Sequence, residues 1–512
     1  MRSDAGVSRL GPLLPPDCWN PALDLRLEFP EPAPAPFVTR LASYPWLVVG
    51  TVCIGAFIGQ LDASIVQLAM PSFEDSFDAP LHAVSWIAVG YVLAFASALP
   101  VFARLAEVGG RKALYLAGFA LFGLFSGLCG LAPNLPLLIL FRLLQGASGA
   151  ALGANSLVIL VAAAGPERRG KAVGVMAAAQ AVGLSLGPAL GGALLTAFGW
   201  RAIFWVTVPF ALLGAALGWL IVPKTKVFAK DSRFDALGAA FLVPALVALL
   251  LAITELPVWG LSTALVVSAL TAVILLALFV WRERRAPAPL IHLSLLRSPA
   301  FSAGAVGVLM SYALLYGMLF AMSFALMRGY HDPAFAAGLR LTIVPVALGF
   351  VAPFSGALAD KRPRLVMLGG MAFCGVAALA LARLMTGSPD SLPAIMGALA
   401  AFGVGLGLYI APNNSATLGA APADQQGVAG GLVNLLRVLG TGVGVAAASA
   451  MLGWRLEVIA QTHGRTAGAS EAALLAAVGG ALLMLAAFAA LGAVMALIRN
   501  DPEAGRRGGR RI

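Results

Sequence analysis

A series of long apolar runs constrains the fold of this chain more than any other feature. A helix needs about 20 apolar residues to cross the hydrocarbon layer of a membrane. We find fourteen such runs, at 46–70, 84–103, 113–132, 136–163, 171–197, 201–222, 236–256, 262–281, 300–326, 338–358, 364–386, 392–416, 428–452 and 472–498. Hydrophobic residues make up 60% of the chain and charged residues 11%, which is more apolar surface than a soluble fold of this length could bury. The sequence therefore predicts an all-α polytopic membrane protein with fourteen transmembrane helices.

The positions of the basic residues predict the orientation. If both termini are cytoplasmic, most of the 34 lysines and arginines fall in cytoplasmic segments, as the positive-inside rule requires. The predicted outside loops contain only Arg201, Arg328, Arg383, Arg455 and Arg465. The net charge of +11 therefore indicates contact with anionic lipid rather than with nucleic acid. We expect a multi-pass protein of the cell (inner) membrane. The choice between twelve and fourteen spans depends on 236–256 and 262–281, which are both long and apolar.

An internal repeat divides the membrane part into two halves. Residues 100–107 read PVFARLAE and residues 353–360 read PFSGALAD, and basic residues follow both segments. Six spans precede the middle pair and six follow it, which is a transporter architecture with a binding site between the halves. We predict five parts: a disordered cytoplasmic tail at 1–44, an N-terminal six-helix half at 45–222, an inserted helix pair with a cytoplasmic linker at 223–282, a C-terminal six-helix half at 283–498 and a basic cytoplasmic tail at 499–512.

Asp62 is an acidic residue deep inside the first predicted span. A carboxylate at this depth is energetically costly, so such residues usually serve transport of protons, ions or substrate. At about 1.5 Å of rise per residue, Arg142 of the fourth span lies at a similar depth and can pair with Asp62, or with Gln145 one turn on. A neighbouring guanidinium favours the charged carboxylate, whereas burial favours its protonated form. We therefore predict a proton-coupling site of Asp62, Arg142 and Gln145; the alternative is a permanent structural ion pair.

Four stretches carry a family resemblance. They are LDASIVQLAMP at 61–71, ARLAEVGGRK at 103–112, RLLQGASG at 142–149 and GLSLGPALGG at 183–192. Together they resemble the motifs of the major facilitator superfamily, and more closely those of its fourteen-span drug:proton antiporter branch. The resemblance implies the major facilitator fold, with two six-helix halves and an inserted helix pair. In the family the last motif marks exporters rather than uptake systems.

Two groups of residues follow from these motifs. Small residues at intervals of four allow helix backbones to approach closely, and a proline inside a helix permits a bend. The predicted antiporter motif consists of Gly183, Gly187, Pro188, Gly191 and Gly192, with ordinary helix packing as the alternative. Charged residues at cytoplasmic helix ends are predicted to form a gate between the halves, with topogenic charge as the alternative. The gate residues are Glu107, Gly110, Arg111, Lys112, Asp360, Lys361 and Arg364.

Aromatic rings and amides in several spans predict a substrate cavity. Such side chains suit large amphipathic organic ligands, including cations that stack on a ring. The predicted lining consists of Gln180, Tyr312, Tyr316, Asn413, Asn414, Asn434 and Arg437. The two consecutive asparagines follow Pro412, and we expect them to break the span at 392–416. Arg340 is a further charge in a predicted span, and it is a candidate for tuning substrate choice.

These observations predict an efflux antiporter that exchanges amphipathic or cationic organic compounds for protons. The alternatives are a dedicated exporter of a self-made metabolite, siderophore or lipid, and, less favoured, an uptake symporter of the same fold. No nucleotide-binding loop is present, which argues against an ATP-driven pump. We expect no enzyme activity, no metal site and no cofactor other than the proton as coupling ion. A periplasmic adaptor and an outer-membrane channel are expected partners if the source is Gram-negative.

Overall fold

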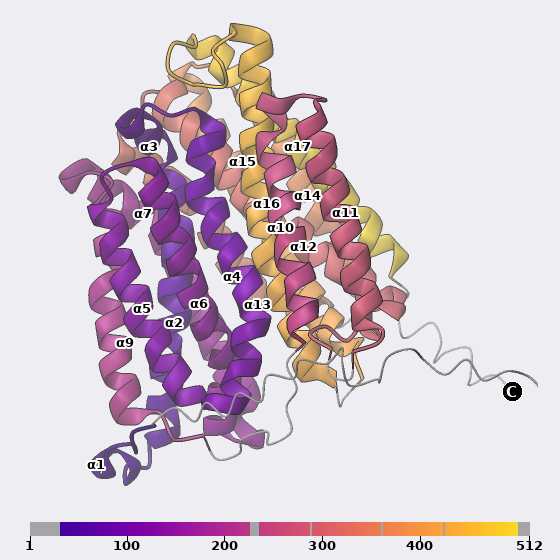
Figure 1. Ribbon diagram of the computed structural model, residues 1–512. Helices are drawn as coiled ribbons and strands as arrows, with labels where there is room; N and C mark the ends of the chain where they lie inside the picture. The colour runs from indigo at the N-terminus through magenta and orange to yellow at the C-terminus, as the bar shows by residue number, and fades with distance from the viewer. Residues whose placement is uncertain (1–30, 226–234, 287–288, 360–361, 423–424, 500–512) are drawn as a thin grey trace, which may run out of the picture.

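The computed structural model describes residues 31–225, 235–286, 289–359, 362–422 and 425–499. Within these residues, fourteen helices are long and apolar enough to cross a membrane. They stand side by side in one bundle, with the short helix α3 (Met70–Phe77) at one end and α1 (Pro36–Thr39) at the other (Figure 1). The predicted number of spans is confirmed, and the chain is an integral multi-pass membrane protein.

Six spans form the N-terminal half. They are α2 (Tyr44–Leu68), α4 (Leu81–Gly109), α5 (Arg111–Leu131), α6 (Leu135–Ala164), α7 (Arg169–Phe198), and the pair α8 (Ala202–Trp205) and α9 (Thr207–Ile221), which together make one span. The connections between them are short, and α3 forms the one between α2 and α4. Gly165 and Gly199 follow α6 and α7 with φ of +75°, a conformation that favours glycine.

Six spans form the C-terminal half, and two more are inserted between the halves. The inserted pair is α10 (Ala236–Trp259) and α11 (Thr263–Glu283). The C-terminal half contains α12 (Pro299–Phe324), α13 (Ala334–Ala359), α14 (Pro363–Leu384), α15 (Leu392–Gly419), α16 (Gln426–Ala460) and α17 (Glu471–Ile498). Five π-helical residues, Ala325–Gly329, extend α12.

The two halves meet through equivalent helices. The second span of each half packs on the fifth span of the other, since α4 contacts α16 and α13 contacts α7. This exchange is what two copies of one six-helix unit produce when they face each other. The inserted helix α10 packs on both α4 and α16, where Trp86 Nε1 donates a hydrogen bond to Glu255 Oε1 at 3.1 Å. The inserted pair therefore covers a seam between the halves.

The prediction of a disordered tail over 1–44 is wrong for residues 31–44. Glu31 accepts hydrogen bonds from the backbone N–H groups of Lys112 (3.0 Å) and Ala113 (3.3 Å) and from the side chain of Thr225 (2.8 Å). The first N–H groups of a helix lack partners within the helix and attract a carboxylate. Glu31 thus caps α5 and fastens this segment to the N-terminal half. Residues 1–30 and 500–512 lie outside the described residues.

Candidate transport site

Asp62 lies at the centre of a fully buried polar group. Its two carboxylate oxygens accept hydrogen bonds from Arg142 Nη1 at 3.0 and 2.7 Å, and Gln145 Nε2 donates to Asp62 Oδ1 at 3.1 Å. Arg142 Nη1 also donates to Gln145 Oε1 (2.7 Å), and Arg142 Nε donates to the Ile87 carbonyl oxygen (3.0 Å). All three residues have 0% exposure. The structure therefore brings the three predicted coupling residues into one hydrogen-bonded cluster of α2 and α6.

A tyrosine separates this cluster from the space between the halves. The Arg142 guanidinium lies over the Tyr91 ring, with 4.2 Å from Cζ to the ring centroid. Tyr91 lines the central cavity, as do Gln60 and Ala63 on either side of Asp62 in α2, whereas Asp62 does not. At 100° of rotation per residue, neighbouring positions of a helix face different directions. Asp62 therefore lies behind the cavity wall, of which Tyr91 is the part in contact with Arg142.

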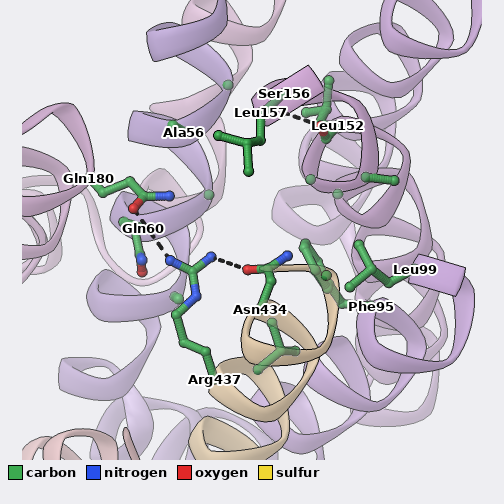
Figure 2. A pocket seen from close by; sticks show the side chains of 18 of the residues that line it. Ala56, Gln60, Phe95, Leu99, Leu152, Ser156, Leu157, Gln180, Asn434 and Arg437 are labelled. Carbon is green, nitrogen blue, oxygen red and sulfur yellow. Dashed lines mark hydrogen bonds between the residues drawn. The ribbon is translucent and has the colours of Figure 1, made fainter. Parts of the chain in front are cut away.

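The central cavity lies between the two halves and has a volume of about 310 Å³. Five predicted residues line it: Gln180, Tyr312, Tyr316, Asn434 and Arg437. Figure 2 shows Arg437 reaching from α16 towards Gln180 of α7, with Nη1 3.4 Å from Gln180 Oε1, while Nη2 donates to Asn434 Oδ1 at 2.7 Å. Tyr316 Oη donates to Gln60 Oε1 at 3.0 Å. Polar contacts thus cross the cavity from one half to the other.

Asn413 and Asn414 do not line this cavity, and they do not break their span. Helix α15 continues through Pro412 to Gly419. A proline removes only one hydrogen bond from a helix, and neighbouring helices compensate for the loss in a membrane bundle. Asn413 instead points into the C-terminal half, where Nδ2 donates to the Gly304 carbonyl oxygen at 2.9 Å and Oδ1 accepts from Arg499 at 3.1 Å. The sequence could not predict this direction because helical rotation, not residue type, decides it.

The antiporter motif presents two faces of α7. A methyl group added at Gly183, Gly187 or Gly191 would overlap atoms of α2, around the turns that carry Asp62. A methyl group at Gly192 would overlap the backbone of α13 in the other half. In the reverse direction, a methyl group at Gly338 of α13 would overlap the Pro188 carbonyl oxygen of α7. Small residues at these positions are therefore required for close approach. The motif packs α7 against the helix of Asp62 on one face and against the opposite half on the other.

The end of the bundle that carries α3, here the α3 end, holds a buried acid that joins the two halves. Glu74 of α3 is 3% exposed. Its carboxylate lies 3.3 Å from Arg328 Nη2 and accepts from the backbone N–H of Thr466 at 2.6 Å, and both partners belong to the C-terminal half. Burial raises the pKa of Glu74, against the lowering effect of Arg328 and Thr466. The Arg465–Asp78 ion pair, at 2.7 Å, also joins the halves here, but on the exposed surface.

At the opposite end, here the Gly110 end, the predicted gate residues Glu107 and Lys112 make side-chain contacts with the N-terminal half. Glu107 pairs with Arg104 and with Arg111, at 4.0 Å for the latter, and Lys112 Nζ donates to the Trp219 carbonyl oxygen at 2.9 Å. Gly110 has φ of +111° and precedes α5. A second cavity, of about 650 Å³, lies between the halves at this end. Among the described residues, the halves are therefore joined by charged contacts at the α3 end and separated by cavities towards the Gly110 end.

The remaining charged residues singled out in the sequence lie away from the central cavity or outside the described residues. Arg364 lies at the start of α14 and makes no ion pair with a described residue, while Asp360 and Lys361 lie outside the described residues. Arg340 pairs with Asp332 near the start of α13 and does not line the central cavity. In the part of the chain that the structure describes, no group of three His, Cys, Asp or Glu side chains could hold a metal ion.

Three features of this region were not predicted from the sequence. Tyr91 and Gln60 line the cavity beside the Asp62 cluster, and Glu74 joins the halves. The position of Gln60, half a turn before Asp62, was an available signal, because polar side chains are rare in spans. Glu74 lies just beyond a span, where an acidic residue is ordinary, so its sequence position gives no signal.

Comparison with known proteins identifies the family. Residues 52–445 match the family model described as Major Facilitator Superfamily. The chain belongs to this superfamily. The predicted superfamily and fold are therefore confirmed, and the chain is a transporter with two six-helix halves and an inserted helix pair.

Relatives in the superfamily are named for the transport of different compounds. The multidrug resistance protein Stp of Mycobacterium tuberculosis is 32% identical over 422 residues, which cover 80% of this chain and 76% of Stp. The riboflavin transporter RibZ of Clostridioides difficile is 29% identical over 402 residues, which cover 78% of this chain and 87% of RibZ. Among solved structures, an inward-facing, unoccupied bacterial homologue of the human lysosomal transporter Spinster gives a TM-score of 0.64 at 16% identity, with 90% of this chain and 100% of that chain covered. This likeness shows the fold alone.

Proposed function

We propose that this transporter is a multidrug efflux antiporter that exports amphipathic organic compounds in exchange for protons. The observation that carries the proposal is the buried cluster of Asp62, Arg142 and Gln145, in which Arg142 lies against the cavity-lining ring of Tyr91. A carboxylate in this position can bind and release a proton if its arginine partner moves. The cavity beside it offers aromatic rings and amides to an organic solute.

The positive-inside rule favours a cytoplasmic Gly110 end, and in that orientation the cavities between the halves lie towards the cytoplasm. A solute enters the central cavity from this side and contacts Tyr91, which lies against Arg142. Rocking of the halves then opens the α3 end and releases the solute outside. A proton from outside reaches Asp62, neutralises it and loosens its bonds to Arg142 and Gln145. The protonated transporter returns, and the proton leaves to the cytoplasm as the cluster forms again.

The antiporter motif supports this cycle through its packing. Gly183, Gly187 and Gly191 hold α7 tightly against α2, the helix of Asp62, and Gly192 meets the opposite half. A change at the Asp62 cluster is therefore transmitted to the interface between the halves by closely packed backbones. The similarity to Stp, named a multidrug resistance protein, favours export of foreign compounds.

The similarity to RibZ favours a second candidate, a transporter for one aromatic metabolite. The two candidates differ in breadth. Several unrelated amphipathic compounds should compete for transport in a multidrug exporter, whereas a single compound and its close analogues should compete in a dedicated transporter.

Reconstituted transporter tests the proposal. Proteoliposomes with an imposed pH gradient should concentrate amphipathic compounds, and a protonophore should abolish this. Asp62→Asn should lose gradient-driven transport by about tenfold or more, since a group that stays neutral cannot exchange a proton. Asp390→Asn, which changes an exposed acid in the loop before α15, is the matched control. Gradient-driven transport at the wild-type rate in Asp62→Asn would refute proton coupling through this residue.

A further inference from the structure

The walls of the central cavity carry one sign of charge. Among the described residues that line it, Arg437 is the only one with a formal charge, and no aspartate or glutamate is present. The closest acid in α2, Asp62, is fully buried and bonded to Arg142, with Tyr91 between this pair and the cavity. A bound solute therefore meets a positive charge and no accessible negative charge.

Arg437 has no acidic partner within the described residues. Its guanidinium donates to two neutral amides, at 2.7 Å to Asn434 Oδ1 and at a longer 3.4 Å to Gln180 Oε1. Both amides belong to the cavity wall, and Figure 2 shows the guanidinium between them, at the edge of the open space. A partly buried cation with only neutral acceptors remains under-compensated. An anionic ligand that replaces the weak contact to Gln180 would provide the missing charge, in the forked geometry that arginine offers to a carboxylate.

Aromatic rings surround this cation. The Tyr312 ring centroid lies 5.9 Å from Arg437 Cζ, and Tyr91, Tyr316 and Phe95 also line the cavity. Flat rings present large apolar faces on which a planar solute can stack. The cavity volume of about 310 Å³ lies at the lower end of the range for sites of drug-sized ligands.

We propose that Arg437 makes this cavity selective for flat aromatic solutes that are anionic or neutral, and that it discriminates against permanent cations. The proposal rests on the central cavity being the transport site of the proposed function, and it specifies the substrate class of that site. Specificity arises here from repulsion as well as attraction, since a cation next to Arg437 is unfavourable whatever its shape. The sequence-based expectation included cations among the ligands of this cavity, and the proposal replaces that part with anionic and neutral solutes.

Substrate charge also decides which part of the proton-motive force drives transport. The exit of an anion and the entry of a proton both make the inside more positive, so an inside-negative potential accelerates the exchange. Exchange of a neutral solute for one proton moves one net positive charge inwards. A monovalent cation exchanged for one proton moves no net charge. The proposed substrates therefore make transport electrogenic.

Binding to the purified transporter tests the proposal without any gradient. Three flat probes of different charge are compared at equilibrium: fluorescein with its carboxylate, neutral riboflavin and the permanent cation ethidium. Wild-type protein should bind fluorescein and riboflavin at least about tenfold more tightly than ethidium, because juxtaposed like charges are strongly unfavourable. Arg437→Gln should remove the preference for fluorescein over ethidium, and Arg437→Lys should retain part of it. Arg383→Gln removes an exposed arginine that does not line this cavity, and it should leave all three affinities unchanged.

Two results would overturn the proposal. One is ethidium binding as tightly as fluorescein to wild-type protein; the other is an unchanged preference in a folded Arg437→Gln variant. Failure of all three probes to bind would reject the cavity as an aromatic-solute site. Because binding is measured without a proton gradient, loss of coupling in Asp62→Asn has no bearing on the outcome. Conversely, an ethidium preference would refute the charge selectivity while proton antiport stands.

Discussion

Two buried acids lie close together in the chain and differ in what they connect. Asp62 in α2 bonds to Arg142, and both belong to the N-terminal half. Glu74 in α3 bonds to Arg328 and Thr466, which belong to the C-terminal half. Both carboxylates are almost completely removed from water. The first pair can stay together when the halves move as rigid bodies, whereas the second cannot.

This difference separates two tasks of a transport cycle. An acid held inside one half keeps its surroundings while the halves rock, so its protonation is controlled by local access, here past Tyr91. An acid held between the halves loses its partners whenever the α3 end opens. Its protonation therefore biases the equilibrium between the two conformations. We expect Asp62 to govern coupling and Glu74 to govern closure.

Removing Arg142 should have the largest effect. Arg142→Ala leaves the Asp62 carboxylate buried without its cationic partner, a change that typically costs about 3–5 kcal/mol. We expect a clear fall in the thermal unfolding temperature and loss of gradient-driven transport, with Arg142→Lys partly restoring both. Thermal unfolding in detergent together with proteoliposome transport measures the two effects. An alanine variant with wild-type stability would show that the pair contributes no net stabilisation.

A side chain at the contact between α7 and α13 should act mainly on closure. Gly192→Val places methyl groups against the Ala334–Phe335 backbone of the other half, and overpacking of this kind costs roughly 1–3 kcal/mol. The α3 end should open, so a single cysteine introduced at Ser72 of α3 should react faster with a membrane-impermeant thiol reagent. Gly174→Val changes the same helix where an added Cβ meets nothing within 4 Å. Equal labelling in both variants would exclude a closing role for this contact.

The Glu74 contact should make closure depend on pH. Burial raises the pKa of Glu74 in the closed arrangement, above the usual value for glutamate of about 4.3. Protonation of Glu74 therefore stabilises the closed arrangement of the α3 end. This stabilisation is complete below the ordinary pKa of glutamate and is lost as pH rises through the raised pKa of Glu74. Acid also lowers the thiolate fraction of any cysteine, so each labelling rate is divided by the rate of the same cysteine in denatured protein at that pH. The corrected labelling rate of the α3 cysteine should fall as the outside solution is acidified, and Glu74→Gln should abolish this fall. A pH trend that persists in Glu74→Gln would assign it to another group.

The exposed ion pair at the same end should have the smallest effect. Arg465 and Asp78 are 39% and 86% exposed, and exposed pairs contribute about 0–1 kcal/mol. Asp78→Asn should leave transport and labelling close to wild type, and added salt should reduce any difference further. A large change in Asp78→Asn, measured by the same cysteine labelling, would mean that burial does not distinguish the contacts at the α3 end.

The sequence by itself determined the number of spans, the two halves and the inserted helix pair. Lipid accepts only long apolar helices, so the spans are readable one by one. Asp62 and Arg142 were predictable partners because the rise of a helix converts sequence position into depth. Depth leaves rotation open, which is why Asn413 was wrongly assigned to the cavity.

Only the tertiary structure decided which side chains meet across the halves. Glu74 contacts Arg328 and Thr466, which lie far along the chain, and the Arg437 guanidinium likewise approaches Gln180 of the other half. Such contacts depend on how the two halves pack against each other, and local residue spacing does not encode this packing. The Glu31 carboxylate at the start of α5 is a further case, since it accepts hydrogen bonds from Lys112, Ala113 and Thr225 although the composition of its own segment is typical of disorder.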